Sequence, residues 1–216
     1  MRKLILAVLS FALLTTGFHG CKKAEKISID ALIHFYAGTV TINGIPVTGV
    51  GQKIKFGDII ATGDSGICKI LIEDKTILQL KKNSELVYEI SKINSVLQIN
   101  KGWLAGITRK SFSFSKKYII KTPTVTAAIR GTSYCIKIES ADSSYFCVCN
   151  GTINLSGKGS NGGEDVQASH HKARRFKKDE SGTILAEEAK MLYHGDEVIE
   201  NLAKEIGETV DWTRPY

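Results

Sequence analysis

The sequence lacks an apolar run long enough to cross a membrane as a helix. A spanning helix needs about 20 consecutive apolar residues, and the most apolar stretch of the 216 residues runs only from Leu4 to Leu14. We therefore expect no transmembrane helix in this chain.

Helical periodicity is nearly absent between residues 35 and 155, and this absence excludes a parallel βαβ architecture. Instead, short stretches of alternating apolar and polar residues recur about every ten residues between turn-forming residues. Asn43-Gly44 is a strong signal for a two-residue hairpin turn. The pattern predicts an all-β fold, an antiparallel sandwich or roll of many short strands.

The familiar motifs of catalytic and metal sites are also absent. The sequence contains no Cys-x-x-Cys and no His-Glu-x-x-His. A nucleophilic Cys147 would need a histidine base, and every histidine is remote from it in sequence. The adjacent His170 and His171 do not share a face, and a metal on Cys135, Cys147 and Cys149 lacks a fourth ligand. We expect no enzyme, no cofactor and no metal, with a redox or metal role for these cysteines as a weaker option.

One hairpin can be aligned residue by residue from its alternating pattern. Bringing the apolar faces of residues 134–138 and 145–149 together allows one register, because a slip by one residue would mix the faces. This register predicts the cross-strand pairs Ile136–Phe146, Tyr134–Val148, Cys135–Cys147 and Ser133–Cys149. Cross-strand neighbours lie within disulfide range, so a Cys135–Cys147 bridge and a pair of reduced thiols both fit.

The first residues are typical of a secretory leader. Arg2-Lys3 precedes the apolar stretch, and a small residue, Gly20, stands directly before Cys21. This arrangement resembles bacterial lipoprotein leaders, in which the cysteine becomes the acylated first residue of the mature chain. Phe18-His19 departs from the usual motif, a looseness for which spirochaete lipoproteins are known. An ordinary cleaved leader with unmodified Cys21 is the alternative; in both cases the chain leaves the cytoplasm.

A series of short motifs over residues 36–157 resembles the FecR domain family in order and spacing. The motifs are Gly57 to Gly66, Leu71 to Asp74, Gly102, Lys121 to Thr124, Ile129 to Thr132 and Asn150-Gly151. Asp74-Lys75 departs from the family, which usually has a glycine after the aspartate. FecR proteins are best known as inner-membrane regulators that receive a signal outside the cytoplasm and act on a sigma factor inside it. The resemblance implies the same β-fold and, for this chain, only the extracytoplasmic sensing or interaction module.

The motif residues are expected to hold the fold. They are Gly57, Asp58, Thr62, Gly102, Thr122, Pro123, Arg130, Gly131, Thr132 and Gly151. Glycine suits turns with positive φ, and Pro123 should begin a strand or lie at an edge because it cannot donate a backbone hydrogen bond. Arg130 follows an apolar run, so its guanidinium needs acceptors. An internal ion pair is the main interpretation, and ligand binding is the alternative.

The tail of the chain differs from the β-domain. We divide the chain into a leader (1–20), a tether (21–35), the β-domain (36–157), a basic Gly/Ser-rich loop (158–182) and a helical segment (183–216). The spacing of Leu185, Ala189 and Leu192 predicts one helix, and Asp196 would cap a second. The basic stretch from His170 to Lys178 is either a solvated segment or a contact for an anionic surface.

These observations favour a non-enzymatic, lipid-anchored protein of the cell envelope, on either membrane and on the periplasmic or surface side. Its FecR-like domain would act as an interaction or sensing module, without a cytoplasmic part that regulates a sigma factor. The alternative is a structural or surface-exposed lipoprotein with no signalling role. The expected partners are the membrane through acylated Cys21 and an envelope protein or anionic polymer. Nucleic acid is not expected, because a secreted lipoprotein seldom meets it.

Overall fold

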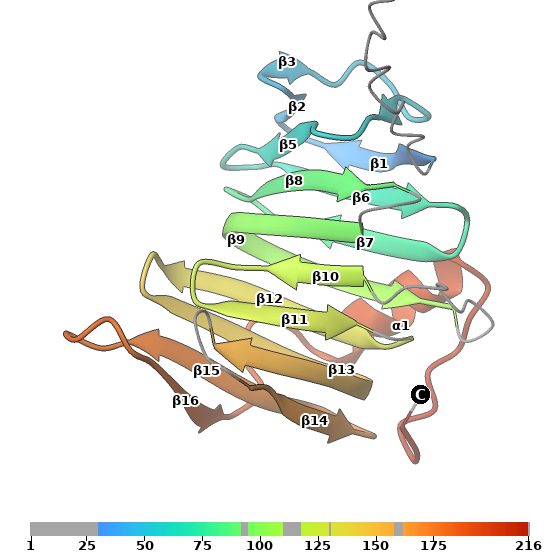
Figure 1. The fold of residues 1–216 in the computed structure, drawn as a ribbon. Coiled ribbons are helices and arrows are strands. Elements are labelled where there is room, and N and C mark those ends of the chain that lie inside the picture. Colours follow the sequence, from blue (N-terminus) through green and yellow to red (C-terminus); the bar gives the residue numbers. More distant parts are fainter. Residues whose placement is uncertain (1–29, 92–94, 110–117, 130, 158–161, 216) are drawn as a thin grey trace, which may run out of the picture.

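The computed structural model describes residues 30–91, 95–109, 118–129, 131–157 and 162–215. In this part of the chain the strands form two stacked layers that are joined through two shared strands (Figure 1). The first layer contains, in spatial order, β4 (Lys53–Ile54), β1 (Ala31–Ala37), β6 (Ile67–Ile72), β7 (Thr76–Leu80), β12 (Ser133–Ser140), β15 (Lys172–Lys178) and β16 (Ile184–Ala189). The second contains β3 (Ile45–Pro46), β2 (Val40–Ile42), β5 (Ile59–Thr62), β8 (Glu85–Ile90), β10 (Tyr118–Lys121), β11 (Val125–Ile129) and β14 (Glu164–Ala168).

The two shared strands are the longest, β9 (Ser95–Thr108) and β13 (Ser143–Gly157). The first part of β9 pairs with β8 and β10 in the second layer, and its last part pairs with β7 and β12 in the first. Likewise, β13 begins in the first layer against β12 and β15 and ends in the second against β11 and β14. The predicted all-β roll is confirmed; of these pairings only β9 with β10 is parallel.

The predicted hairpin is β12–β13, and most of its register is confirmed. Ile136 pairs with Phe146, and Cys135 pairs with Cys147. The predicted partner of Ser133 was wrong, because an irregularity after Ser133 shifts the register and places Asn150 opposite it. A bulge of this kind inserts a residue into one strand, and alternation alone does not reveal it.

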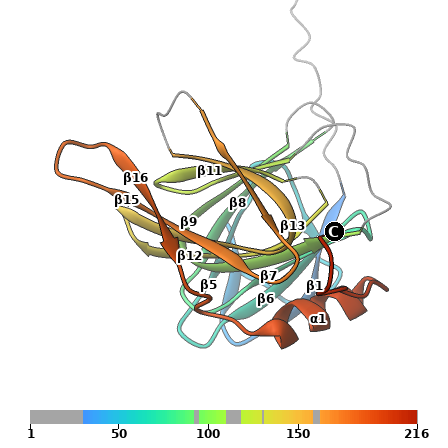
Figure 2. The same cartoon turned by 90° about the horizontal axis from the view of Figure 1, so that it is seen from below.

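Two apolar cores stabilise the fold. The inter-layer core lies between the two layers and includes Ile33, Ile60, Ile70, Leu86, Leu97, Ile136 and Phe146, all fully buried. The helix core lies on the outer face of the first layer, beneath α1 (Asp196–Glu205), and includes Ile77, Ala105, Ile107, Cys135, Cys147, Cys149, Ile199 and Leu202. Figure 2 shows α1 along the outside of that layer.

The end of the chain differs from the prediction in two places. The expected loop carries β14 and β15, and the expected helix from residue 183 is the strand β16. The second predicted helix exists as α1, but its N-cap is Gly195 without a side-chain hydrogen bond. Asp196 instead lies in the first turn, where an acidic residue is favourable to the helix dipole. No described helix has both the length and the apolar character that a membrane span requires.

Candidate functional site

Two cysteines and two histidines from separate segments meet at the rim of the helix core. Cys147 and Cys149 lie on β13, His171 immediately precedes β15, and His194 lies between β16 and α1. Each residue offers one donor atom, and these four atoms all lie within 4.8 Å of one another. We call these four residues the Cys–His cluster.

Strand geometry explains why the two cysteines share a face. Residues two apart on a strand point the same way, and the alternation of β13 directs Phe146 and Val148 into the inter-layer core. Cys147 and Cys149 therefore face the helix core, where both are fully buried. Their position follows from the pattern that fixed the hairpin register.

Backbone conformation positions the first histidine. His171 has a φ of 48°, in the left-handed region that few residues other than glycine adopt, and its N–H donates to the carbonyl of Cys149 at 2.9 Å. Its side chain thereby reaches Cys147, with 3.6 Å between Nδ1 and Sγ. Left-handed non-glycine residues are strained and concentrate at functional sites.

The second histidine completes the group from the opposite side. His194 Nε2 lies 3.2 Å from the sulfur of Cys149 and 3.3 Å from Nδ1 of His171. The preceding residue, Tyr193, also has a positive φ, 69°. One member of the cluster, His171, and the residue before the other histidine are thus both left-handed.

Acceptors on the far side of each ring determine which nitrogen carries hydrogen. His171 Nε2 lies 2.7 Å from a carboxylate oxygen of Asp196, and His194 Nδ1 lies 2.9 Å from the carbonyl oxygen of Leu192. Because both partners only accept, each of these nitrogens carries the hydrogen in a neutral ring. The nitrogens that face the sulfurs, Nδ1 of His171 and Nε2 of His194, then present lone pairs.

The cysteines have opposite protonation tendencies. The pKa of Cys147 lies well below its usual value. The largest cause is a hydrogen bond from the Cys149 thiol, which outweighs the effect of burial, and contacts with both histidines lower the pKa further. Burial, reinforced by Cys147, raises the pKa of Cys149. A thiolate at Cys147 is the form that acts as a nucleophile or metal ligand.

The end of the chain covers the cluster. The ring of Trp212 lies 4.9 Å from that of His170 and 5.1 Å from that of His171, and its indole N–H donates to Glu200. The amide of Asn150 donates to the carbonyls of Asp211 and Arg214. These contacts hold the last described residues over the histidines.

The arrangement can support two kinds of chemistry. Cys147, His171 and Asp196 are arranged like a catalytic nucleophile, its base and the carboxylate that orients the base. However, Cys147 is fully buried, and no substrate could reach it there. Four donor atoms around one point are instead typical of a closed metal site. Sequence reasoning identified the cysteines and missed His171 and His194 as their neighbours, because only folding brings them to β13.

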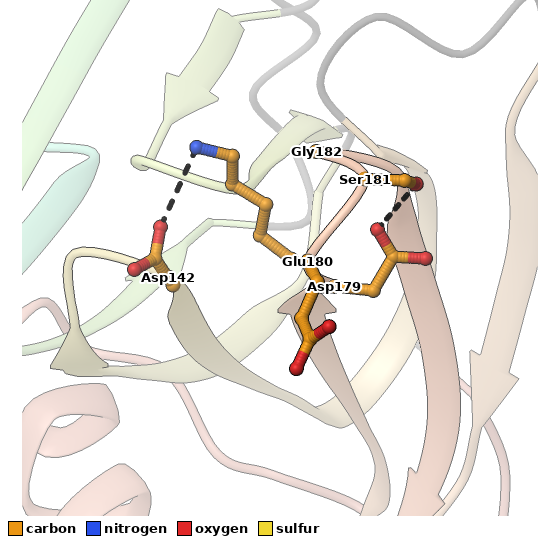
Figure 3. A pocket seen from close by; sticks show the side chains of 6 residues that line it. Asp142, Asp179, Glu180, Ser181 and Gly182 are labelled. Carbon is orange, nitrogen blue, oxygen red and sulfur yellow. Dashed lines mark hydrogen bonds and ion pairs between the residues drawn. The ribbon is translucent and has the colours of Figure 1, made fainter.

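A surface hollow lies elsewhere in the described part of the chain. It has a volume of about 420 Å³ and is lined by residues of the β15–β16 turn and by Asp142 (Figure 3). Its polar groups pair with one another: Lys178 lies 3.7 Å from Asp142, and the hydroxyl of Ser181 donates to Asp179. Its lining contains neither cysteine nor histidine.

Comparison with known proteins identifies the β-domain. The family model described as FecR protein matches residues 58–154. The chain carries a FecR domain. FecR proteins are membrane-associated, regulatory and non-enzymatic.

Solved structures resemble the chain only distantly, and no curated protein matches it. Two crystal structures of a candidate anti-sigma factor from Parabacteroides distasonis, at 2.50 and 1.65 Å resolution, share 13% identity with it at a TM-score of 0.49. The similarity covers 61% of this chain and 60% of theirs, so the chain spans about three fifths of that protein's length.

Two FecR motif glycines lie where the shared strands change layers. Gly102, with a φ of 90°, separates the two parts of β9, and Gly151, with a φ of 118°, separates those of β13. A Cβ on Gly102 would lie 2.3 Å from Ser84 Cα, and one on Gly151 would lie 2.9 Å from the hydroxyl of Thr132. These corners require glycine because of both conformation and space.

The other FecR motif residues form turns and hydrogen bonds. Thr62 donates to the carbonyl of Lys81 and accepts from the N–H of Ser84. Gly57 donates its N–H to the carbonyl of Tyr88, and Asp58 accepts from the side chain of Asn43 and from the N–H of Lys55. Thr122 accepts from the N–H of Val125, and Pro123 lies in the turn between β10 and β11. Gly131 has a φ of 55°, and Thr132 donates to the carbonyl of Thr152. Cys21 and Arg130 lie outside the described residues.

The basic stretch next to the FecR domain is strand β15, and ion pairs neutralise most of its cations. Arg174 is only 8% exposed, and its guanidinium donates to both carboxylate oxygens of Glu164. Its neighbour Arg175 donates to both carboxylate oxygens of Glu139, from Nη2 to Oε1 and from Nε to Oε2. Lys177 and Lys178 pair with Glu187 and Asp142. The stretch is largely engaged within the protein.

Proposed function

We propose that this chain is a non-enzymatic, lipid-anchored sensing or interaction module of the cell envelope. The observation that carries the proposal is the FecR family match over residues 58–154. The leader that ends in Gly20-Cys21 supports the anchoring and the extracytoplasmic location. The full burial of Cys147, the nucleophile of the cysteine–histidine–aspartate arrangement, supports a role other than catalysis.

Acylation of Cys21 is the part of the proposal that can be tested most directly. The wild-type chain should enter the detergent phase of a phase-partitioned cell extract and should incorporate a labelled fatty acid. Cys21→Ser should move to the aqueous phase and lose the label, whereas Cys68→Ser, a change at a buried cysteine, should behave as wild type. Aqueous partitioning of the wild-type chain would exclude the anchored module.

A second experiment distinguishes sensing inside the envelope from display on the surface. In intact cells, protection of the chain from added protease would support a partner within the envelope. Digestion in intact cells would favour the alternative, a surface-exposed lipoprotein. Permeabilised cells serve as the control, because the chain should then be digested in either case.

A further inference from the structure

The Cys–His cluster has a set of donor atoms to which the proposed function assigns no role. We propose that Cys147, Cys149, His171 and His194 bind one Zn²⁺ ion in a closed tetrahedral site. The ion would fix residues 190–215, which we call the C-terminal segment, to the last strand of the FecR domain. This inference is independent of lipid anchoring and of sensing.

Three of the six distances between donor atoms are close to the edges of a tetrahedral zinc site, and the other three are at most 4.8 Å. With Zn–S bonds of about 2.3 Å and Zn–N bonds of about 2.0–2.1 Å, the edges of the tetrahedron measure roughly 3.3–3.8 Å. The nitrogen–nitrogen edge between His171 and His194 measures 3.3 Å, and the edge between Cys147 and His171 measures 3.6 Å. The edge between Cys149 and His194 is slightly shorter, 3.2 Å.

The orientation of the two imidazoles points to a cation between them. Both rings donate their hydrogen outward, to Asp196 and to the carbonyl of Leu192. When both rings are neutral, two lone pairs consequently face each other across 3.3 Å, and either a proton or a metal cation between the two nitrogens removes their repulsion. A carboxylate or carbonyl behind the ring is also the usual outer shell of a metal-bound histidine.

The ligand types select the metal. Two thiolates and two neutral imidazoles suit a borderline metal ion with tetrahedral preference, and Zn²⁺ is the redox-inactive ion of that class. Mg²⁺ and Ca²⁺ require oxygen ligands, and a four-cysteine iron–sulfur cluster lacks its ligands at this position. With four protein ligands and both sulfurs fully buried, no coordination position is open for a substrate.

The origin of the ligands indicates what the ion would do. Both cysteines lie inside the FecR-matched residues, whereas both histidines lie beyond them. His194 lies two residues before α1, and the first residue of this helix, Asp196, accepts a hydrogen bond from His171 and orients it. Zn²⁺ would therefore hold α1 and the covering Trp212 against the outer face of the first layer.

Metal content is the first test. The full chain, purified without chelators, should contain one equivalent of zinc by elemental analysis. After zinc is removed, added Co²⁺ should give the intense visible bands of a tetrahedral ion and a thiolate-to-cobalt charge-transfer band. Mg²⁺ should not compete. A full chain that holds neither zinc nor cobalt, or that holds copper and refuses zinc, would overturn the proposal.

Matched variants assign the ligands. Cys149→Ser and His194→Gln should each abolish stoichiometric zinc, whereas Cys135→Ser and His170→Gln should keep it. Cys135 is the control of choice because it is equally buried and pairs with Cys147 across the hairpin, yet lies outside the cluster. Asp196→Asn, a change in a positioning residue, should weaken Co²⁺ binding roughly 10-fold while the tetrahedral spectrum persists.

A stability measurement covers the case in which a ligand variant does not fold. For the wild-type chain, saturating Zn²⁺ should raise the Tm by roughly 10 °C over the chelator-treated protein. Zinc-dependent protection of the C-terminal segment from protease should accompany the shift. An unchanged Tm, or a Cys135–Cys147 disulfide in the non-reduced protein with no bound zinc, would refute the site.

Discussion

The inter-layer core and the helix core are built from different side chains. Aliphatic and aromatic residues from almost every strand fill the inter-layer core, and Cys68 is its only cysteine among the described residues. The helix core is smaller and contains Cys135, Cys147 and Cys149 together with Trp103 and Tyr145. Apolar burial therefore suffices to hold the layers together, whereas the attachment of α1 combines a small apolar contact with polar ties.

Those polar ties are concentrated in the C-terminal part of the molecule. Glu139 on β12 accepts from Arg175 on β15 and from the hydroxyl of Tyr193. Asp196 accepts from His170 and His171. From this difference we infer that the FecR domain can retain its fold when α1 and the C-terminal segment are released.

The largest effect is expected in the inter-layer core. Phe146 is fully buried and its ring lies 6.1 Å from that of Tyr134. Phe146→Ala should reduce the free energy of unfolding by about 3–5 kcal/mol, measured by chemical denaturation. All structural probes should report the same loss of stability. Selective release of α1 by this variant would contradict the conclusion that the inter-layer core holds the two layers together.

A layer corner should be nearly as sensitive. In Gly102→Ala the new methyl group would meet the Ser84 backbone at a left-handed residue, so we expect a loss of about 3 kcal/mol. Gly57→Ala is the matched control, because Gly57 also has a positive φ, 92°, but open space around it. The control should lose only about 1 kcal/mol. Equal losses would show that conformation alone, and not the close approach of strands, requires the glycine.

The sequence was sufficient to predict the fold where the determining interactions are local. Period-two alternation specified the all-β class, and the two apolar faces of β12 and β13 specified the pairing of Cys135 with Cys147. The helix predicted from Leu185 was wrong because β16 is stabilised by a neighbouring strand. Glu187 and Glu188 stand opposite Arg175 and Arg174, a complementarity that the sequence contains but that only the pairing reveals.

The candidate site was predictable only in part, for a related reason. The Cys-x-Cys spacing on a strand already indicates two sulfurs on one face. His171 follows Cys147 by 24 residues in the sequence, and His194 follows Cys149 by 45. The left-handed turn at His171 and the approach of the chain to α1 are tertiary features, and no local pattern encodes them.

Weakening the helix core should have a smaller and more local effect. Leu202 is fully buried against the first layer. Leu202→Ala should lower the free energy for opening of α1 by about 2 kcal/mol, at the low end for such a change because the helix can separate locally. Amide exchange in α1 should accelerate about 30-fold, while the amides of β6 and β8 should exchange as in wild type. Uniform acceleration in both layers would show that the two cores unfold as one unit.

The smallest effect should come from acid titration of the polar ties. Although partial burial opposes the shift, hydrogen bonds from Arg175, Ser143 and Tyr193 lower the pKa of Glu139 to about 2. Because the folded-state pKa lies below the ordinary value, this carboxylate stabilises the fold fully above about pH 5, and the contribution is lost as the pH falls from about 4.5 toward 2. With solvent screening we expect about 1–2 kcal/mol. Chemical denaturation of the wild type at several pH values, against Glu139→Gln, measures it: the variant should be less stable at neutral pH and the two should converge in acid. A constant gap between them across this range would show that ionised Glu139 does not tie β12 to the C-terminal part.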